Sequence, residues 1–202
     1  MHFEFLLEEE TSEKVLDNLM PKIITGEHTY RCIRFQGKKD LIKNLPNRLK
    51  AYKRWIPNNY RLIVLIDRDK DDCIELKKSL DQMAVNAGLI IKSAVHRNTF
   101  QVLNRIAIEE IESWFFGDAD AMRLAYPKLS QKFESKANYR DPDNILNTWE
   151  TMEKLLQRAG YFKTGLRKTE AAYEISQHMK PLNNRSKSFQ IFWEGISVCL
   201  QE

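Results

Sequence analysis

The stretch LIVLIDRD, residues 62–69, decides the fold of this chain. Its first five residues are all apolar, which is typical of a strand covered on both faces in a parallel sheet. A Pro-Asn-Asn turn at 57–59 precedes the stretch, and Asp67 and Asp69 end it. The sequence therefore predicts an α/β fold with a polar site where this strand ends.

Strand and helix patterns alternate on both sides of this stretch. Thr11 or Ser12 is expected to cap the first helix, Pro21 to bend or end it, Pro46 to interrupt the second helix and Gly88 to stop the third. The expected strands are residues 3–7, 29–35, 62–66, 89–95 and 100–108. This order predicts parallel strands joined by right-handed crossovers.

The second half of the chain changes character and is mostly helical. A helix over IEEIESWFF, residues 108–116, is expected to end at Gly117. Two later apolar stripes have helical spacing and predict core positions: Ile145, Trp149, Met152, Leu155 and Leu156, then Phe189, Phe192, Trp193, Ile196 and Leu200. We predict an α/β core over 1–98 and, over 99–202, a strand plus a helical extension packed on that core. The boundary is soft, and a single domain is the alternative.

Composition narrows the class of protein. Apolar residues make up 43% of the chain, enough for a buried core. No run approaches the ~20 apolar residues that a membrane span needs. The acidic N-terminal segment is unlike a secretory signal, so the expected location is the cytoplasm. Three widely separated cysteines argue against a disulfide framework and a zinc ribbon.

Basic residues are concentrated in two segments. Residues 31–61 contain ten Lys or Arg and one acid, and residues 158–187 contain seven Lys or Arg and two acids. Basic flanks around an acidic centre suit a phosphate-bearing polymer that approaches a metal, so nucleic acid is the expected partner. Solvated helix faces would give the same pattern and remain an alternative.

Acidic side chains follow two of the predicted strands. Glu8 comes directly after the first strand, and Asp67 and Asp69 come directly after the third. If these strands are neighbours, the three carboxylates converge at one edge of the sheet. Mg²⁺ or Mn²⁺ prefers such oxygen ligands, so we expect Glu8, Asp67 and Asp69 to be metal ligands and catalytic residues.

Further candidates flank this predicted metal site. Glu9 competes with Glu8 for the strand-end position. Glu110 and Glu112 would point to different faces of one helix, and Glu110 is preferred because it lies nearer the preceding strand. Offsetting the helix dipole is the alternative role for both. The candidate phosphate ligands are Lys38, Lys39, Arg185 and Lys187. Solvated lysines at a turn and a cap on the last helix are the alternatives there.

The two acidic motifs resemble the Toprim pattern of a strand-end Glu followed by a strand-end DxD. FLLEEETSE (5–13) and LIVLIDRDKDD (62–72) carry the resemblance, and the pattern is shared by topoisomerases, primases and overcoming-lysogenization-defect (OLD) nucleases. Most of the chain is also similar to an uncharacterised Toprim-like family of this length. The segments concerned are FQGKKDL (35–41), LIDRDKDDC (65–73), IAIEEIESWFFGD (106–118), YRDPD (139–143) and NRSKSFQIF (184–192).

This resemblance implies a Toprim-like parallel sheet flanked by helices and Mg²⁺-dependent cleavage of DNA or RNA. Glu8 would match the Toprim glutamate, and Asp67 and Asp69 the metal-binding aspartates. Glu9 stands where a Gly often follows, so the register between Glu8 and Glu9 stays open. Such proteins are often encoded beside AAA-type ATPases, which resembles phage-defence pairs and implies an ATPase partner. The chain lacks room for the tyrosine-bearing domain of a topoisomerase.

Three functions compete. A metal-dependent nuclease is preferred. A phosphatase with Asp67 as nucleophile would match the haloacid dehalogenase pattern, which usually lies on the first strand rather than the third. A non-catalytic Toprim-like module that binds a partner ATPase is the last alternative. Neither an HExxH motif, a GxSxG motif nor a P-loop is present. Homo-oligomerisation is left open.

Overall fold

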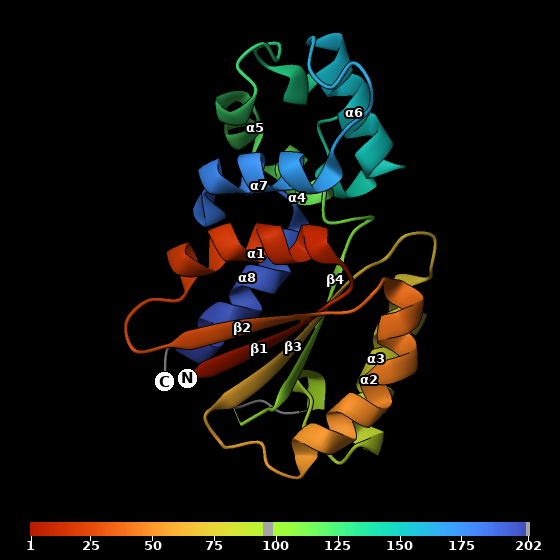
Figure 1. Cartoon of the computed structure of the whole chain (residues 1–202), viewed down its shortest axis with the longest axis vertical. Helices are drawn as coiled ribbons and strands as arrows, with labels where there is room; N and C mark the ends of the chain where they lie inside the picture. The colour runs from red at the N-terminus through yellow and green to blue at the C-terminus, as the bar shows by residue number, and fades with distance from the viewer. Residues whose placement is uncertain (95–98, 201–202) are drawn as a thin grey trace.

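The computed structural model describes residues 1–94 and 99–200, and the fold is built on one parallel sheet (Figure 1). Its strands are β1 (His2–Leu7), β2 (Thr29–Arg34), β3 (Tyr60–Asp67) and β4 (Val102–Ala107). The spatial order is β2-β1-β3-β4, and all neighbours are parallel. β3, which contains the LIVLID run, therefore lies inside the sheet, and helices cover both of its faces, as its uninterrupted apolar sequence predicts.

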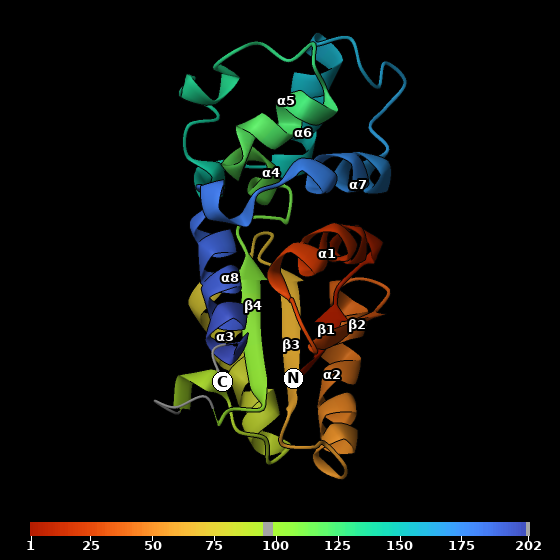
Figure 2. The same cartoon turned by 90° about the vertical axis from the view of Figure 1, so that its left-hand side faces the viewer.

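Helices cover both faces of the sheet. α1 and α8 lie on one face, and α2 and α3 lie on the other (Figures 1 and 2). The helices are α1 (Glu10–Ile23), α2 (Lys38–Lys53), α3 (Cys73–Asn86), α4 (Ser113–Gly117), α5 (Ala119–Ala125), α6 (Thr148–Arg158), α7 (Lys168–His178) and α8 (Lys187–Leu200). Short 3₁₀ turns lie at Lys92–Ala94, Phe133–Ser135, Pro142–Asn144 and Pro181–Asn183.

Alternate residues of each strand point to opposite faces of the sheet and pack in two separate apolar layers. In β1, Phe5 and Leu7 pack towards α1 and α8, and Leu6 packs towards α2 and α3. All three are fully buried. This two-sided burial confirms the α/β fold with a parallel sheet flanked by helices.

The helical extension lies beyond the carboxyl ends of the strands. Figure 2 shows α4, α5, α6 and α7 as a lobe above the tip of β4. α7 packs on α1, and α8 then returns along the sheet beside β4. β4 itself belongs to the sheet although it follows residue 98. No helix among the described residues is long and apolar enough to cross a membrane.

The expected strand over residues 89–95 is wrong for its described part, 89–94. Ile91 forms one isolated bridge to Val102, and a 3₁₀ turn follows at once. β4 occupies the place beside β3, so the preceding segment is left without a ladder partner beyond that bridge. Residue 95 lies outside the described residues.

Both proline expectations and one capping expectation need correction. Pro21 and Pro46 lie inside continuous helices, and α1 begins at Glu10, ahead of Thr11 and Ser12. The leucine stripe of α2 is fully buried against the sheet. Tertiary packing of that stripe outweighs the backbone hydrogen bond that proline removes.

Candidate metal and phosphate site

Backbone hydrogen bonds join, in two pairs, the loops that follow the four strands. The amide of Gly37, after β2, donates to the carbonyl of Glu8, after β1, at 2.9 Å. The amide of Asp69, after β3, donates to the carbonyl of Glu109, after β4, at 2.8 Å. Gly37 has a φ of 93°, a backbone conformation that favours glycine. The strand ends therefore form one connected surface beneath the helical extension.

Glu8 and Asp67 are brought together at this surface. The backbone amide of Asp67 donates to Oε2 of Glu8 at 3.1 Å, and Asp67 is only 5% exposed. Burial raises the pKa of Glu8 to about 7. Burial also raises the pKa of Asp67, and the nearby Glu112 and Glu8 add to that rise. The charge of Glu8 thus makes Asp67 more costly to ionise.

Glu112 is fully buried at the same surface, and the helix expected around it does not form. Glu110 and Glu112 lie in bends and turns before α4, which covers only Ser113–Gly117. Glu112 is 0% exposed, and within the described chain neither of its carboxylate oxygens accepts a hydrogen bond. Burial raises its pKa. A turn in place of a helix points Glu112, rather than the preferred Glu110, towards Asp67. We call Glu8, Asp67 and Glu112 the carboxylate cluster.

Lys168 supplies positive charge to the carboxylate cluster, and sequence reasoning missed it. Its Nζ lies 2.9 Å from Oε1 of Glu9 and 3.3 Å from Oε1 of Glu112. Burial opposes its charge, but Glu112 and Glu9 raise its pKa overall. Lys168 starts α7, and no sequence motif separates it from the other lysines nearby. Glu9 therefore holds Lys168, while Glu8 contacts the amide of Asp67.

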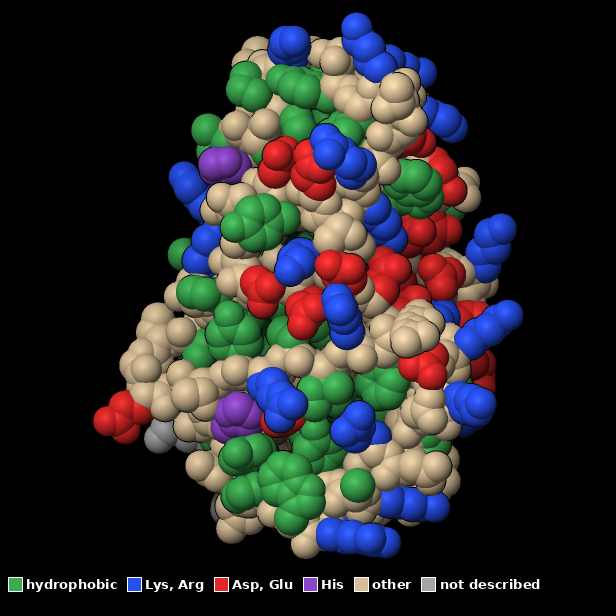
Figure 3. All heavy atoms as spheres, viewed as in Figure 1, with side chains coloured by type: hydrophobic (Ala, Val, Ile, Leu, Met, Phe, Trp, Pro, Cys, Tyr) green, Lys and Arg blue, Asp and Glu red, His purple; other side chains and the backbone are tan. Residues whose placement is uncertain are grey.

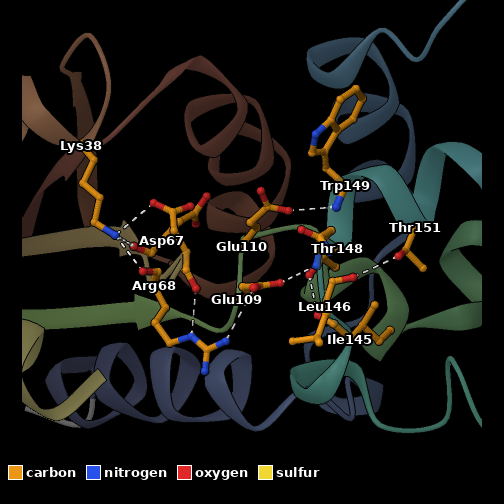
Figure 4. A network of polar contacts seen from close by, with 12 residues as sticks. Lys38, Asp67, Arg68, Glu109, Glu110, Ile145, Leu146, Thr148, Trp149 and Thr151 are labelled. Carbon is orange, nitrogen blue, oxygen red and sulfur yellow. Dashed lines mark hydrogen bonds and ion pairs between the residues drawn. The ribbon is translucent and has the colours of Figure 1, made fainter. Parts of the chain in front are cut away.

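Lys38 holds the loop after β3 (Figure 4). Its Nζ donates to the carbonyls of Asp67 and Arg68 at 2.7 and 2.8 Å, and to Oδ2 of Asp69 at 3.0 Å. It also lies 2.7 Å from Oδ2 of Asp71. The Asp69 side chain is 45% exposed and faces this ammonium. Lys38, expected to bind phosphate, is committed to protein oxygens, and Asp69 lies at the rim of the cluster.

Glu109 and Glu110 hold the start of α6. Oε2 of Glu109 accepts from the amide of Asn147 at 2.6 Å, and Oε2 of Glu110 accepts from the amide of Trp149 at 2.9 Å (Figure 4). Arg68 extends from the β3 loop to within 3.9 Å of Glu109. The strand-end loops and the helical extension therefore form one polar network, in which Glu110 caps a helix.

The other candidate phosphate ligands lie at the surface. Lys39 and Lys187 are exposed. Arg185 donates to the carbonyls of Arg140 and Phe116. Ser186 Oγ accepts from the amide of Phe189 at 3.1 Å, so the segment around Arg185 caps α8, as the alternative interpretation expected.

The donor set fits a hard divalent cation. It consists of carboxylate oxygens, which such cations prefer. Both carboxylate oxygens of Glu112 accept no hydrogen bond from the described residues. Within residues 1–94 and 99–200, no three His, Cys, Asp or Glu side chains are already placed around one point. Glu8, Asp67 and Glu112 could hold an ion after side-chain rotation, with Asp69 at the rim.

The fold places the chain in a class of α/β proteins that includes a region of OLD proteins. The C-terminal region of the Burkholderia pseudomallei OLD protein is 14% identical, with a TM-score of 0.50 and coverage of 96% of both chains. The corresponding region from Xanthomonas campestris pv. campestris is 13% identical, with a TM-score of 0.49 and coverage of 98% of this chain and 96% of that chain. At such identities the likeness concerns the fold alone.

The chain belongs to the family described as a domain of unknown function, DUF4276, whose profile matches residues 7–197. No curated protein sequence matches it significantly. The expected parallel sheet flanked by helices is thus confirmed, and the chain shares its fold with that region of the OLD protein.

Proposed function

We propose that this chain is a Mg²⁺- or Mn²⁺-dependent phosphodiesterase that cleaves DNA or RNA. The observation that carries the proposal is the carboxylate cluster, which gathers acids from three strand ends beside one ammonium. Burying carboxylates without full compensation is costly, and such groups concentrate at functional sites. A divalent cation would supply the missing positive charge.

The cluster has the groups that phosphodiester cleavage needs. Glu8, Asp67 and Glu112 would hold the ion, which when bound polarises a phosphate oxygen and offsets its charge. Glu8 has a pKa of about 7 in the metal-free protein, so it can exchange a proton near neutral pH. Lys168, held by Glu9 and Glu112, would add positive charge beside the cluster that favours an approaching phosphate.

Two features favour nucleic acid over a small phosphate ester. The basic segments 31–61 and 158–187 belong to the sheet and to the extension on either side of the cluster. The Toprim resemblance of the Glu8 and Asp67–Asp69 motifs implies the same reaction class. A phosphatase with Asp67 as nucleophile is disfavoured because this aspartate is 5% exposed and crowded by other acids, a setting that suits a metal ligand.

The test compares Glu8→Gln with Glu9→Gln and with the nearby exposed control Glu10→Gln. Plasmid, linear DNA and RNA are incubated with Mg²⁺ or Mn²⁺, with and without any co-encoded AAA-type ATPase. Glu8→Gln should abolish cleavage, because glutamine keeps the shape but neither accepts a proton nor matches a carboxylate as ligand. Glu9→Gln should be milder and Glu10→Gln neutral.

Cleavage that persists in Glu8→Gln and disappears in Glu9→Gln would move the site by one residue. Cleavage that survives both changes and Asp67→Asn would refute the mechanism. If the wild-type protein cleaves nothing under any of these conditions, the phosphodiesterase proposal fails and the Toprim-like binding module takes its place.

A further inference from the structure

Trp149 is an aromatic side chain that packs in neither of the two apolar layers. The buried face of α6 consists of Thr148, Met152, Leu155 and Leu156. Trp149 is half-buried and belongs neither to the two core clusters nor to the side chains packed against them. The core position expected for it from the apolar stripe is therefore wrong. It lies one turn before Met152 on the same side of α6, but in the first turn of the helix its side chain stays partly exposed.

The other tryptophans all have apolar or aromatic partners. Trp114 is fully buried, and Trp193 packs against the core. Trp55 is 55% exposed, but its ring lies 5.3 Å from Tyr52 and 5.8 Å from Tyr60. Trp149 has no aromatic partner among the described residues. Its indole is therefore partly exposed and is not covered by another aromatic ring of the described chain.

The position of Trp149 is fixed by the loop that builds the carboxylate cluster. Its backbone amide donates to Oε2 of Glu110 at 2.9 Å. Two residues further along the same loop, Glu112 lies beside Asp67. Figure 4 shows the indole standing off the start of α6 above this hydrogen bond, with the Glu110 carboxylate between it and Asp67. An adjacent nucleotide of a bound strand would reach this region.

We propose that Trp149 is the stacking platform for a nucleobase next to the scissile phosphate, and that the substrate is therefore single-stranded DNA or RNA. This inference rests on the proposed function. Indole faces stack on any base, so the contact binds a strand without reading its sequence. Bases in a duplex have both faces covered by their neighbours, whereas a single strand offers an open face to an aromatic side chain.

The experiment measures binding without cleavage, with Ca²⁺ in place of Mg²⁺. The probes are a fluorescein-labelled thymidine 12-mer and the matching duplex. The variants are Trp149→Ala, Trp149→Phe and, as the matched control, Trp55→Ala, which removes the exposed indole at the far end of α2. Tryptophan fluorescence is recorded in parallel with an unlabelled 12-mer, because a stacked base quenches the indole it covers.

Trp149→Ala should weaken single-strand binding by about 5- to 150-fold, the range expected for one lost base–aromatic stack. Trp149→Phe should restore most of that affinity but lose the fluorescence quenching. Trp55→Ala should match the wild type, and duplex should bind more weakly than single strand. Equal affinities of Trp149→Ala and Trp55→Ala, a preference for duplex, or full quenching in Trp149→Phe would each overturn the proposal.

This outcome is separable from that of the proposed function. If the wild-type protein binds neither probe, both ideas about nucleic acid fail, while metal binding is still read from thermal unfolding. If cleavage requires Glu8 and Trp149→Ala binds normally, only the stacking platform is refuted.

Discussion

The ammonium of Lys168 lies 3.3 Å from a carboxylate oxygen of Glu112, a side chain with no exposed surface. Glu112 follows β4, whereas Lys168 begins α7 in the helical extension. The extension therefore supplies the charge that makes burial of the strand-end acids tolerable. It is part of the site and not only an addition to the sheet.

Removing this charge should destabilise the metal-free protein in a pH-dependent way. Lys168→Met leaves the buried carboxylates without their cation, and we expect the free energy of unfolding to fall by about 1–3 kcal/mol at pH 8. The loss should be smaller at pH 5, because the acids can then bind protons. Urea unfolding at both pH values, with the exposed Lys163→Met as control, measures the difference. Equal losses at both pH values would contradict the charge argument.

The raised pKa of Glu8 predicts the direction of a pH effect on stability. Glu8 titrates at about 7 in the folded chain against an ordinary 4.5, so the folded state holds more protons between these values. Stability should therefore fall as pH rises from about 4.5 to 7, by about 2 kcal/mol after solvent screening. Urea unfolding in EDTA should show a shallower fall in Glu8→Gln and an unchanged fall in Glu10→Gln. A rise in stability over this window would show that Glu8 is not held protonated.

Divalent cations should stabilise the folded chain through the carboxylate cluster. A ligand at about 100 times its dissociation constant adds ~2.7 kcal/mol, which for a chain of this size corresponds to a rise of roughly 5–10 °C in Tm. Asp67→Asn and Glu112→Gln should each lose most of this rise with Mg²⁺ or Mn²⁺, while the exposed Glu75→Gln should keep it. Differential scanning calorimetry provides the measurement. Equal rises in all four proteins would place the cation elsewhere.

Replacing Lys38 should lower the stability of the protein more than replacing Lys39, although the two lysines are adjacent and both were candidate phosphate ligands. Lys38→Ala removes the donor to two carbonyls and two carboxylates of the β3 loop, which should cost about 1–3 kcal/mol of stability. Lys39→Ala, at an exposed position, should stay within about 0.5 kcal/mol of the wild type. Chemical denaturation of both variants tests this. A normal stability of Lys38→Ala with weakened nucleic-acid binding would restore the phosphate-binding interpretation.

Local patterns determined the parts of the fold that depend on burial. The five apolar residues before Asp67 predict a strand covered on both faces, and the side chains of β3 enter both apolar layers, Ile63 and Leu65 one and Val64 and Ile66 the other. The same reasoning failed at 89–94, where Leu89 and Ile91 are buried without forming a ladder. Periodicity reports which side chains avoid water, whereas strand pairing depends on which edge is free.

The residues of the site likewise divide into those that local sequence predicts and those that it does not. Glu8 and Asp67 could be predicted because each directly follows a strand, and parallel strands end at one edge of the sheet. Lys168 could not, since it contacts Glu9 from 159 residues away, and nothing local marks a lysine whose partner is that distant. The sequence favours Glu110 over Glu112 because Glu110 lies nearer the preceding strand, but the turn that forms there in place of the expected helix points Glu112 inward. By itself the sequence determined the sheet and the strand-end acids, because the spacing of apolar residues along a segment indicates which side chains are buried and where each strand ends. Only the tertiary structure decided which acids are buried together and which ammonium offsets them, because charge compensation acts through space between distant segments.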